Sequence, residues 1–461
     1  MPKSNKKSTY DILRNIQSNA DSRIHFIGIG GVSMYTLARL ALNSGIKVSG
    51  SDRTVGERVH DLVERGASVF AGHDAENVHG ASLAVYSHAI AYNNPEILEA
   101  KRLGVPLISR AEYMGAVMLD YRNRIGVSGT HGKSTTVAML DEIMTRAKTA
   151  PTVLSGADLS VGEPLKIGSK DLVVYEACEY KDSFLDFYPT ISIGLNLELD
   201  HIDYFEDVAD IQNSFVKGLG KATSFAVVNC DDENLAAIIP KMKSTVITFG
   251  CGERADYRYI ITAFKERGFE FAITTKKRTV GKFELNIPGV FNVTNATAAI
   301  VAAIEYGIDV EVVREAISQY RGIPRRLEYI GERLGREIYY DYAHHPTEIA
   351  ASINALKLFT ENHVTVIFKP HTYSRTECFW EDFRSALSLA DNVILTDIYP
   401  AREDPIDGID SRRLADEIGT KAMFCADNEV VSYLDMHTHG TVIIMGAGDM
   451  DSIKSDILKR V

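Results

Sequence analysis

Cysteine is scarce in this chain of 461 residues, which contains five cysteines: Cys178, Cys230, Cys251, Cys378 and Cys425. Their number is odd and no two of them form a Cys-x-x-Cys pair. The sequence therefore predicts neither a disulfide framework nor a zinc site. Such cysteine usage is typical of a reducing compartment, and we expect a cytoplasmic location.

Long apolar runs and an excess of positive charge are also absent. No apolar run approaches the roughly 20 residues that span a bilayer, and the basic N-terminus lacks the apolar core of a signal peptide. The formal net charge of −12 argues against unspecific binding to nucleic acid or acidic lipid, but not against small anionic substrates. We expect small-molecule partners, no nucleic acid and no membrane insertion, in a monomer or a homodimer.

What the chain does contain is a regular alternation of short β-branched runs with helical patterns, which predicts parallel sheets covered by helices. Its length suggests roughly three domains. We expect an α/β fold with an N-terminal extension (1–22), a Rossmann-like domain (23–121), a central domain (122–323) and a C-terminal Rossmann-like α/β domain (324–461). Shorter alternating runs between about 251 and 288 predict a small antiparallel part in the central domain.

The stretch IHFIGIGGVSM is a glycine-rich turn between a predicted strand and a predicted helix. Gly28, Gly30 and Gly31 allow a sharp turn and the close approach of a diphosphate to the helix N-terminus. Asp52 ends the next strand, where a dinucleotide-binding fold has its ribose-binding acid. Because Ser33 replaces the third glycine of that fingerprint, NAD, another nucleotide and a nucleotide-sugar diphosphate all remain open, as does a turn without ligand.

A second loop, GVSGTHGKSTT, lies a hundred residues further on, between another predicted strand and helix. In such a loop the backbone amides surround phosphates, Lys133 contacts the β- and γ-phosphate oxygens, and Ser134 binds Mg²⁺. The strict Walker pattern has glycine where Val127 stands, so this is a shortened variant. We interpret it as an ATP site, with a chance Gly-Lys-Ser turn as the alternative.

Polar side chains also follow two later strands of the central domain. Glu176 and Glu179 follow the strand in VVYEACEYKDSF, and a carboxylate at a strand end beside a P-loop suits a metal ligand. Asn196, Asp200 and His201 follow the strand in GLNLELDHIDYF. Strand ends of open α/β sheets collect ligand contacts, although either segment alone would also fit a solvated loop.

The C-terminal domain shows the same pattern twice. YYDYAHHPTEI brings Asp341, Tyr342 and His345 to a strand end before a proline-initiated helix, and VIFKPHTYSRT brings His371 and Arg375 to another. A single histidine in such a place is more often a helix-start residue. Several polar residues at adjacent strand ends favour a binding site.

Together these motifs resemble the Mur ligases, ATP-dependent enzymes of peptidoglycan synthesis. GIGGVSM, GTHGKSTT, EACEYKDSFL, LDHIDYF, DYAHHPTEI and PHTYSRT occur in the order and spacing of that family, over nearly the whole chain. The likeness is greatest to the branch that attaches L-alanine to UDP-N-acetylmuramate. It implies a three-domain ligase that uses ATP and Mg²⁺ and proceeds through an acyl phosphate.

The resemblance also implies site residues by position. The UDP substrate would contact Gly28, Gly30, Gly31, Ser33, Ser51, Asp52 and Ser87. ATP would contact Gly129, Thr130, His131, Gly132, Lys133, Ser134, Thr135, Asn292, Asn295, Arg326, Asp341 and Tyr342. Mg²⁺ would be held by Ser134, Glu176 and His201. The catalytic set would be Lys133, Glu176, His201, His345 and Arg375, of which His345 and Arg375 also face the reacting carboxylate and alanine.

We expect His345 to help the alanine amine lose its proton. The sequence departs from the common family pattern at Phe291 (often His), Thr372 (Arg in some members) and His88 (a small hydroxyl residue), and in EACEYKDSF, where EADESDGSF is commoner. Four alternatives stay open. They are a murein-recycling ligase that adds a tripeptide, a folate or cyanophycin-type ligase, which would not need GIGGVSM to hold UDP, a non-catalytic ATP-binding regulator, and an NAD-dependent oxidoreductase, which would leave GTHGKSTT unexplained.

Overall fold

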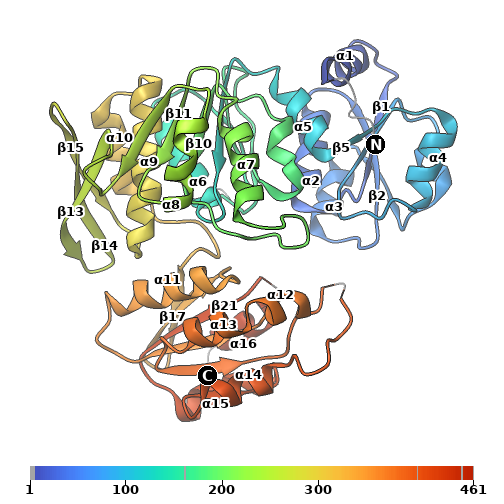
Figure 1. Cartoon of the computed structure of the whole chain (residues 1–461). Helices are drawn as coiled ribbons and strands as arrows, with labels where there is room; N and C mark the ends of the chain where they lie inside the picture. Colours follow the sequence, from blue (N-terminus) through green and yellow to red (C-terminus); the bar gives the residue numbers. More distant parts are fainter. Residues whose placement is uncertain (1–5, 160–161, 402, 448–449, 460–461) are drawn as a thin grey trace. The chain divides into compact units, whose positions relative to one another are not determined.

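A computed structural model describes residues 6–159, 162–401, 403–447 and 450–459 (Figure 1). The chain forms two compact units. One comprises the chain up to Tyr259 together with Ile273–Gly281 and Thr297–Ala316, and the other comprises Ile260–Ala272, Lys282–Ala296 and the chain from Ile317 onward. None of the helices in the described part of the chain has the length and apolar character that crossing a membrane requires.

The N-terminal sheet has five parallel strands in the order β3-β2-β1-β4-β5. Its strands are β1 (Arg23–Ile27), β2 (Lys47–Asp52), β3 (Ser68–Ala71), β4 (Leu83–Tyr86) and β5 (Leu107–Ser109), and its helices are α2 (Val32–Asn43), α3 (Glu57–Glu64), α4 (Pro95–Leu103) and α5 (Arg110–Met118). The strand order reverses between β1 and β4. In open parallel sheets the crevice at such a reversal is where ligands bind.

The expected N-terminal extension contains a helix that the sequence analysis did not foresee. Helix α1 (Lys6–Gln17) packs against α5 and buries Leu13 and Ile16 in the same apolar core as the N-terminal sheet. Residues 1–5 of the extension lie outside the described part of the chain. The helix is therefore part of the N-terminal fold.

The central sheet has ten strands in the order β15-β14-β13-β12-β11-β10-β6-β9-β7-β8. Its first seven strands along the chain are β6 (Asn123–Ser128), β7 (Thr152–Leu154), β8 (Leu165–Lys166), β9 (Leu172–Glu176), β10 (Ile191–Gly194), β11 (Phe225–Asn229) and β12 (Val246–Gly250), and the helices are α6 (Lys133–Arg146), α7 (Val208–Leu219), α8 (Glu233–Ile238), α9 (Val290–Tyr306) and α10 (Val310–Gln319). Strand β6 pairs in parallel with β9 on one side and with β10 on the other. The loops that follow these three strands therefore meet at one edge of the sheet.

One end of this sheet is built from β13 (Tyr257–Lys265), β14 (Gly268–Thr275) and β15 (Thr279–Leu285). Strands β13 and β14 are joined by only two residues, which requires an antiparallel hairpin because a parallel connection is far longer. The antiparallel part expected between about 251 and 288 is therefore present.

The C-terminal sheet has six strands in the order β16-β17-β21-β18-β19-β20, all parallel except β16. The strands are β16 (Glu328–Arg333), β17 (Arg336–Asp341), β18 (Val364–Phe368), β19 (Asn392–Leu395), β20 (Ala422–Phe424) and β21 (Thr441–Met445), and the helices are α11 (Pro346–Lys357), α12 (Tyr373–Cys378), α13 (Trp380–Leu387), α14 (Ser411–Ile418), α15 (Val430–His437) and α16 (Asp451–Leu458). Every residue of β18 and β21 is buried, as both faces of such a sheet are covered.

Candidate active site

The glycine-rich turn after β1 borders a cavity of about 700 Å³ at the strand-order reversal of the N-terminal sheet. Gly28 has a φ of +83°, a conformation that glycine adopts without strain. Of the residues predicted to hold the UDP substrate, all but one line this cavity: Gly28, Gly30, Gly31, Ser33, Asp52 and Ser87. A cavity of this size on a helix N-terminus suits a nucleotide diphosphate.

Asp52 and Ser51, at the end of β2, play different parts. The Asp52 carboxylate accepts hydrogen bonds from the amides of Gly30 (2.9 Å) and Thr54 (3.1 Å), so it braces the turn while it lines the cavity. Ser51 is the predicted residue that does not line the cavity. It is fully buried, and its hydroxyl donates to Glu96 at 2.6 Å.

Glu96 is the centre of a buried polar network beneath the glycine-rich turn. Besides Ser51, its carboxylate contacts His73 (3.0 Å), Asn77 (2.7 Å) and His25 (3.6 Å). Burial opposes ionisation, but these partners more than offset it and lower the pKa of Glu96 to about 2. The network ties β1, β2 and α4 together.

The P-loop after β6 is held in shape by the loop that follows β10. Gly129 (φ +152°) and Gly132 (φ +84°) have the positive φ that the turn requires. The Asn196 side chain accepts a hydrogen bond from the His131 amide at 2.8 Å and donates one to the His131 carbonyl at 3.0 Å. The Thr130 hydroxyl accepts one from the Glu198 amide at 2.9 Å. Loop geometry is therefore set before any nucleotide binds.

Lys133, the first residue of α6, has an acidic partner in the protein. Its ammonium group lies 3.2 and 3.3 Å from the two carboxylate oxygens of Glu179 and also donates to the carbonyls of Gly129 and Thr130. Burial is the largest single effect and would lower the pKa of Lys133, but the charges of Glu179, Cys178 and Glu176 together outweigh it and raise the pKa. Lys133 is therefore a cation at neutral pH, held next to the phosphate-binding loop.

Glu179 also faces His201, so the loops after β9 and β10 converge on the P-loop. The His201 Nε2 atom lies 3.7 Å from Glu179 Oε1. The ring of Tyr180 packs on the His201 imidazole with centroids 4.6 Å apart, and the Tyr180 hydroxyl donates to Asp203 at 2.6 Å. His201 itself has a φ of +55°, a strained conformation for a non-glycine residue that is typical of functional sites.

Glu176, at the end of β9, lies beside a second cavity of about 210 Å³. Its carboxylate accepts hydrogen bonds from the Ser155 hydroxyl (3.0 Å) and the Gly156 amide (2.6 Å). The same cavity is lined by Ser33 of α2 and Arg110 of α5, both of which also line the first cavity. The diphosphate cavity and the cavity beside the metal-ligand candidate Glu176 are therefore neighbours.

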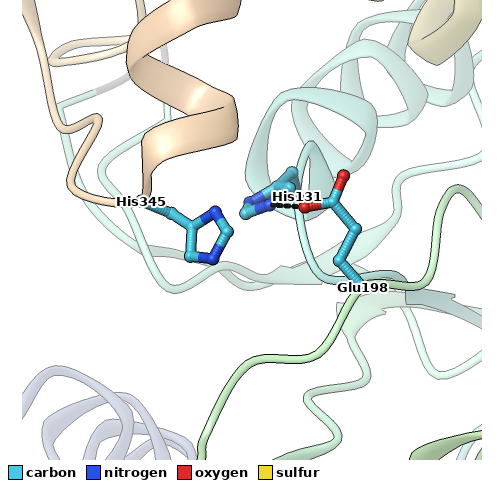
Figure 2. A group of neighbouring side chains, drawn as sticks. All are labelled: His131, Glu198 and His345. Carbon is cyan, nitrogen blue, oxygen red and sulfur yellow. Dashed lines mark ion pairs between the residues drawn. The ribbon is translucent and has the colours of Figure 1, made fainter. Parts of the chain in front are cut away.

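Figure 2 shows the ion pair between His131 and Glu198, whose His Nε2 and carboxylate oxygen lie 3.5 Å apart. It joins the P-loop to the loop after β10, as the Asn196 contacts do. His131 therefore supports the P-loop through both its backbone and its side chain.

The two asparagines expected to face adenine lie in the first turns of α9 and are buried. Asn292 donates to the Pro288 carbonyl at 2.7 Å, and Asn295 donates to the Asn292 side-chain oxygen at 3.2 Å. Phe291, where the family often has histidine, lies against Gly289, whose φ is +96°. The adenine contact itself stays a prediction.

In the C-terminal domain, Arg326, Asp341 and Tyr342 lie close together. The Arg326 guanidinium lies over the Tyr342 ring at 5.2 Å from its centroid, and Arg325 lies over the same ring at 4.9 Å. Asp341 is buried, where it accepts from the Ser352 hydroxyl at 2.7 Å and the Ala343 amide at 3.1 Å. Burial raises the pKa of Asp341 to about 6.

The raised pKa of Asp341 predicts that ionisation of this carboxyl group destabilises the C-terminal domain. The pKa of Asp341 in the folded chain lies above its ordinary value of 3.8, so its contribution to stability is lost as the pH rises through about 6. Asp341→Asn should therefore raise the free energy of unfolding of this domain at pH 7.5 by on the order of 2 kcal/mol. The gain should shrink by more than half at pH 4.5, which calorimetric unfolding at the two pH values measures.

Asp404→Asn, at an exposed position of the same domain, is the control and should leave stability unchanged at both pH values. A gain for Asp341→Asn that does not change with pH would show that carboxylate burial is not its source.

His345 caps the N-terminus of α11, which is visible in Figure 2. Its side chain accepts a hydrogen bond from the Thr347 amide at Nδ1 (3.4 Å), and its ring packs edge-on against Phe379 at 4.8 Å between centroids. These contacts hold the imidazole at the start of α11. The expected role in deprotonating the alanine amine stays a prediction, and the alternative of a helix-start residue stays open.

Arg375 lies in the first turn of α12, whose N-cap is Thr372. Thr372 has a φ of +64°, and its hydroxyl accepts from the Arg375 amide at 3.4 Å. Thr372, which stands where some family members have arginine, therefore helps to start this helix. Nearby, burial lowers the pKa of His371 to about 4, so this side chain is neutral at physiological pH.

Three family models match consecutive parts of the chain: "Mur ligase family, catalytic domain" matches residues 23–122, "Mur ligase middle domain" residues 127–303, and "Mur ligase, glutamate ligase domain" residues 325–448. The chain belongs to the Mur ligase family. The expected family and the expected α/β fold class are therefore confirmed.

Individual Mur ligases are similar to this chain over almost their full length. UDP-N-acetylmuramate–L-alanine ligase of Caldicellulosiruptor bescii is 40% identical over 449 residues, which cover 95% of this chain and 99% of that protein. The enzyme of the same name from Clostridium novyi is 38% identical over 445 residues, 95% of this chain and 97% of that protein.

Solved structures agree with this assignment. The crystal structure of UDP-N-acetylmuramate-alanine ligase MurC from Thermotoga maritima superposes with a TM-score of 0.81 at 27% identity and covers 95% of this chain and 98% of that one. A murein peptide ligase from Psychrobacter arcticus superposes with a TM-score of 0.71 at 22% identity, covering 95% and 98%, and shares the fold.

In this Mur ligase the three expected Mg²⁺ ligands lie at the end of β9, in the loop after β10 and in the first turn of α6. The Glu176 carboxylate lines a cavity and accepts two hydrogen bonds, and Ser134 lies beside Lys133. Their oxygen atoms are of the kind that Mg²⁺ prefers, whereas the His201 imidazole is a less usual ligand. The metal site stays a prediction.

The sequence analysis missed two residues that the Mur ligase structure brings to the site. It noted Glu179 but did not include it among the site residues, although its carboxylate joins Lys133 and His201. The sequence signal that could have identified Glu179 is its position as the second glutamate of EACEYKDSF. It did not consider Arg110 at all, because a single arginine at the start of a helix has no distinguishing pattern.

Proposed function

We propose that this chain ligates L-alanine to the lactyl carboxylate of UDP-N-acetylmuramate at the expense of ATP, in the synthesis of peptidoglycan precursors. The observation that carries the proposal is the 210 Å³ cavity that Ser33 and Arg110 line from the diphosphate side and Glu176 lines from the P-loop side. It supplies the path by which a nucleotide-linked substrate reaches a second nucleotide. The names of the full-length relatives point to the same reaction.

In this proposal the two loops have different tasks. The turn after β1, with Gly28, Gly30, Gly31 and Ser33, holds the UDP diphosphate. The P-loop holds ATP, with Lys133 on the β- and γ-phosphates. Ser134 and Glu176 would hold Mg²⁺, with His201 nearby, and when bound the ion would neutralise phosphate charge.

A carboxylate does not condense with an amine at neutral pH, because it lacks a leaving group. The lactyl carboxylate therefore attacks the γ-phosphorus of ATP, and the bond from that phosphorus to the β,γ-bridging oxygen breaks, giving an acyl phosphate and ADP. Lys133 stabilises the negative charge on the transferred group. Glu179 keeps Lys133 charged and in place until the phosphates arrive.

The L-alanine amine then attacks the acyl carbon, and inorganic phosphate leaves the tetrahedral intermediate. The amine gives up a proton in this step, and we assign His345 the role of taking it. The contact of its Nδ1 atom with the Thr347 amide holds the ring at the start of α11. Arg375 is the candidate for the alanine carboxylate, because a guanidinium fork matches a carboxylate.

The proposal also places the chain in the cytoplasm, where its nucleotide substrates are made, as a monomer or a homodimer.

The test is phosphate release from ATP with Mg²⁺ and UDP-N-acetylmuramate, with L-alanine, D-alanine, D-glutamate or a stem tripeptide added in turn. We expect release with L-alanine alone, and a product whose mass is that of the UDP sugar plus one alanyl residue. Release with the tripeptide alone would reassign the chain to murein recycling. Tight ATP binding without phosphate release in the presence of any of these acceptors would identify a non-catalytic regulator.

A further inference from the structure

Arg110, the first residue of α5, is a half-buried cation for which the structure provides no protein anion. In the described part of the chain no carboxylate, carbonyl or hydroxyl is within hydrogen-bond or ion-pair distance of its guanidinium. Burial lowers the pKa of Arg110, and Cys178 opposes this effect. Arg110 is only partly buried, so water reaches it, but an arginine that lines a cavity and has no carboxylate partner is a candidate to bind a ligand anion.

The position of Arg110 is as informative as its lack of a partner. Its side chain lines both the 700 Å³ cavity with the glycine-rich turn and the 210 Å³ cavity with Glu176. Among the residues that the structure describes, Ser33 is the only other one that lines both. Arg110 therefore lies where a ligand anchored by its diphosphate in the first cavity extends toward the metal-ligand candidate in the second.

The surroundings of Arg110 carry charges of both signs. His88 follows β4, and its pKa is lowered by burial and by the charges of Lys181 and Arg110, against the opposing effect of Asp186 and Glu112. Compared with the commoner family pattern EADESDGSF, the segment EACEYKDSF has Cys178 and Lys181 in place of two aspartates and Asp182 in place of a glycine. This segment is therefore less negative than that pattern.

We propose that Arg110 binds the lactyl carboxylate of the UDP sugar and holds it between the diphosphate site and the P-loop. This inference rests on the proposed function and adds the group that recognises the reacting end of the substrate. An arginine fork matches a carboxylate with two parallel hydrogen bonds. It also offsets the repulsion between this carboxylate and the γ-phosphate that it attacks. The diphosphate needs no such cation, because the backbone amides of the turn and the N-terminus of α2 face it.

The experiment compares two ligands that differ in the lactyl group alone, UDP-N-acetylmuramate and UDP-N-acetylglucosamine, by calorimetric titration of the full chain. Arg110→Ala should weaken UDP-N-acetylmuramate at least about tenfold, the effect of one charge-assisted hydrogen bond. It should change the affinities for UDP-N-acetylglucosamine and for ATP less than about twofold. Arg110→Lys, which keeps the charge but loses the fork, should give an intermediate loss for UDP-N-acetylmuramate alone.

Arg102→Ala is the matched control, because Arg102 belongs to the same domain, is 67% exposed and pairs with Glu99. It should change none of the three affinities. Equal losses of both UDP sugars in Arg110→Ala would assign Arg110 to the diphosphate and overturn the proposal, and so would unchanged affinities. The melting profile of Arg110→Ala shows whether this variant folds. If it does not fold, the affinities of Arg110→Lys for the two UDP sugars test the proposal instead.

Failure of this inference is distinguishable from failure of the proposed function. The unaltered chain could release phosphate with L-alanine while Arg110→Ala still prefers UDP-N-acetylmuramate to UDP-N-acetylglucosamine. That result would support the proposed function and contradict the proposed role of Arg110. If the unaltered chain binds both UDP sugars equally and releases no phosphate with any acceptor, both fall.

Discussion

Lys133→Ala should lower the L-alanine-dependent release of phosphate by at least about 10³-fold at saturating ATP. The ammonium group of Lys133 is held at the P-loop by Glu179 and by two loop carbonyls, so its charge is in place before the γ-phosphate arrives. Lys133→Arg keeps the charge, but a planar guanidinium does not fit the position of a compact ammonium, and we expect below a tenth of the original rate. The measurement is the steady-state rate with each variant at several ATP concentrations.

Lys170→Ala provides the control for loss of a lysine from the same domain. Lys170 is 57% exposed, lies 3.6 Å from Asp120 and belongs to neither loop, so its removal should leave the rate within about twofold. A Lys133→Ala variant with near-normal turnover would remove the P-loop lysine from the phosphoryl-transfer step.

Glu179→Ala should reduce the free energy of unfolding of the central domain by roughly 3 kcal/mol, because it leaves Lys133 charged, largely buried and without its counterion. Glu179 is fully buried and Lys133 is 13% exposed by side chain, so solvent screens this pair little. The loss should be much smaller when Lys133 is changed to Met as well. Calorimetric melting of the two single variants and the double variant measures this coupling as a double-mutant cycle.

Glu315→Gln is the control for loss of a surface carboxylate. Glu315 is 66% exposed and pairs with Arg146, and its replacement should change stability by no more than about 0.5 kcal/mol. Additive effects of Glu179→Ala and Lys133→Met would contradict a direct pair. In that case Glu179 would act on His201 alone.

The local patterns of the sequence were sufficient for the elements and for both phosphate loops. Strands β2, β9 and β18 lie where β-branched runs predicted them, because their residues are buried on both faces and the hydrophobic pattern is contained within each segment. The glycines of both loops are recognisable because positive φ at Gly28 and Gly132 excludes most other residues. Helix α1 and strand β20 escaped notice, since β20 has only three residues and α1 buries its apolar side chains only by packing against α5.

Roles that depend on several segments could not be predicted in this way. The sequence alone determined that this chain is an α/β protein with one loop suited to a diphosphate, one loop suited to ATP, and polar side chains at the strand ends between them. Only the tertiary structure decided that Glu179 pairs with Lys133, that Ser51 faces a buried glutamate and not the cavity, and that Arg110 borders both cavities. The reason is that loops and turns are set by the conformational preferences of neighbouring residues, whereas a contact between Lys133 and Glu179, or a cavity between Arg110 and Glu176, exists only after distant strands have paired.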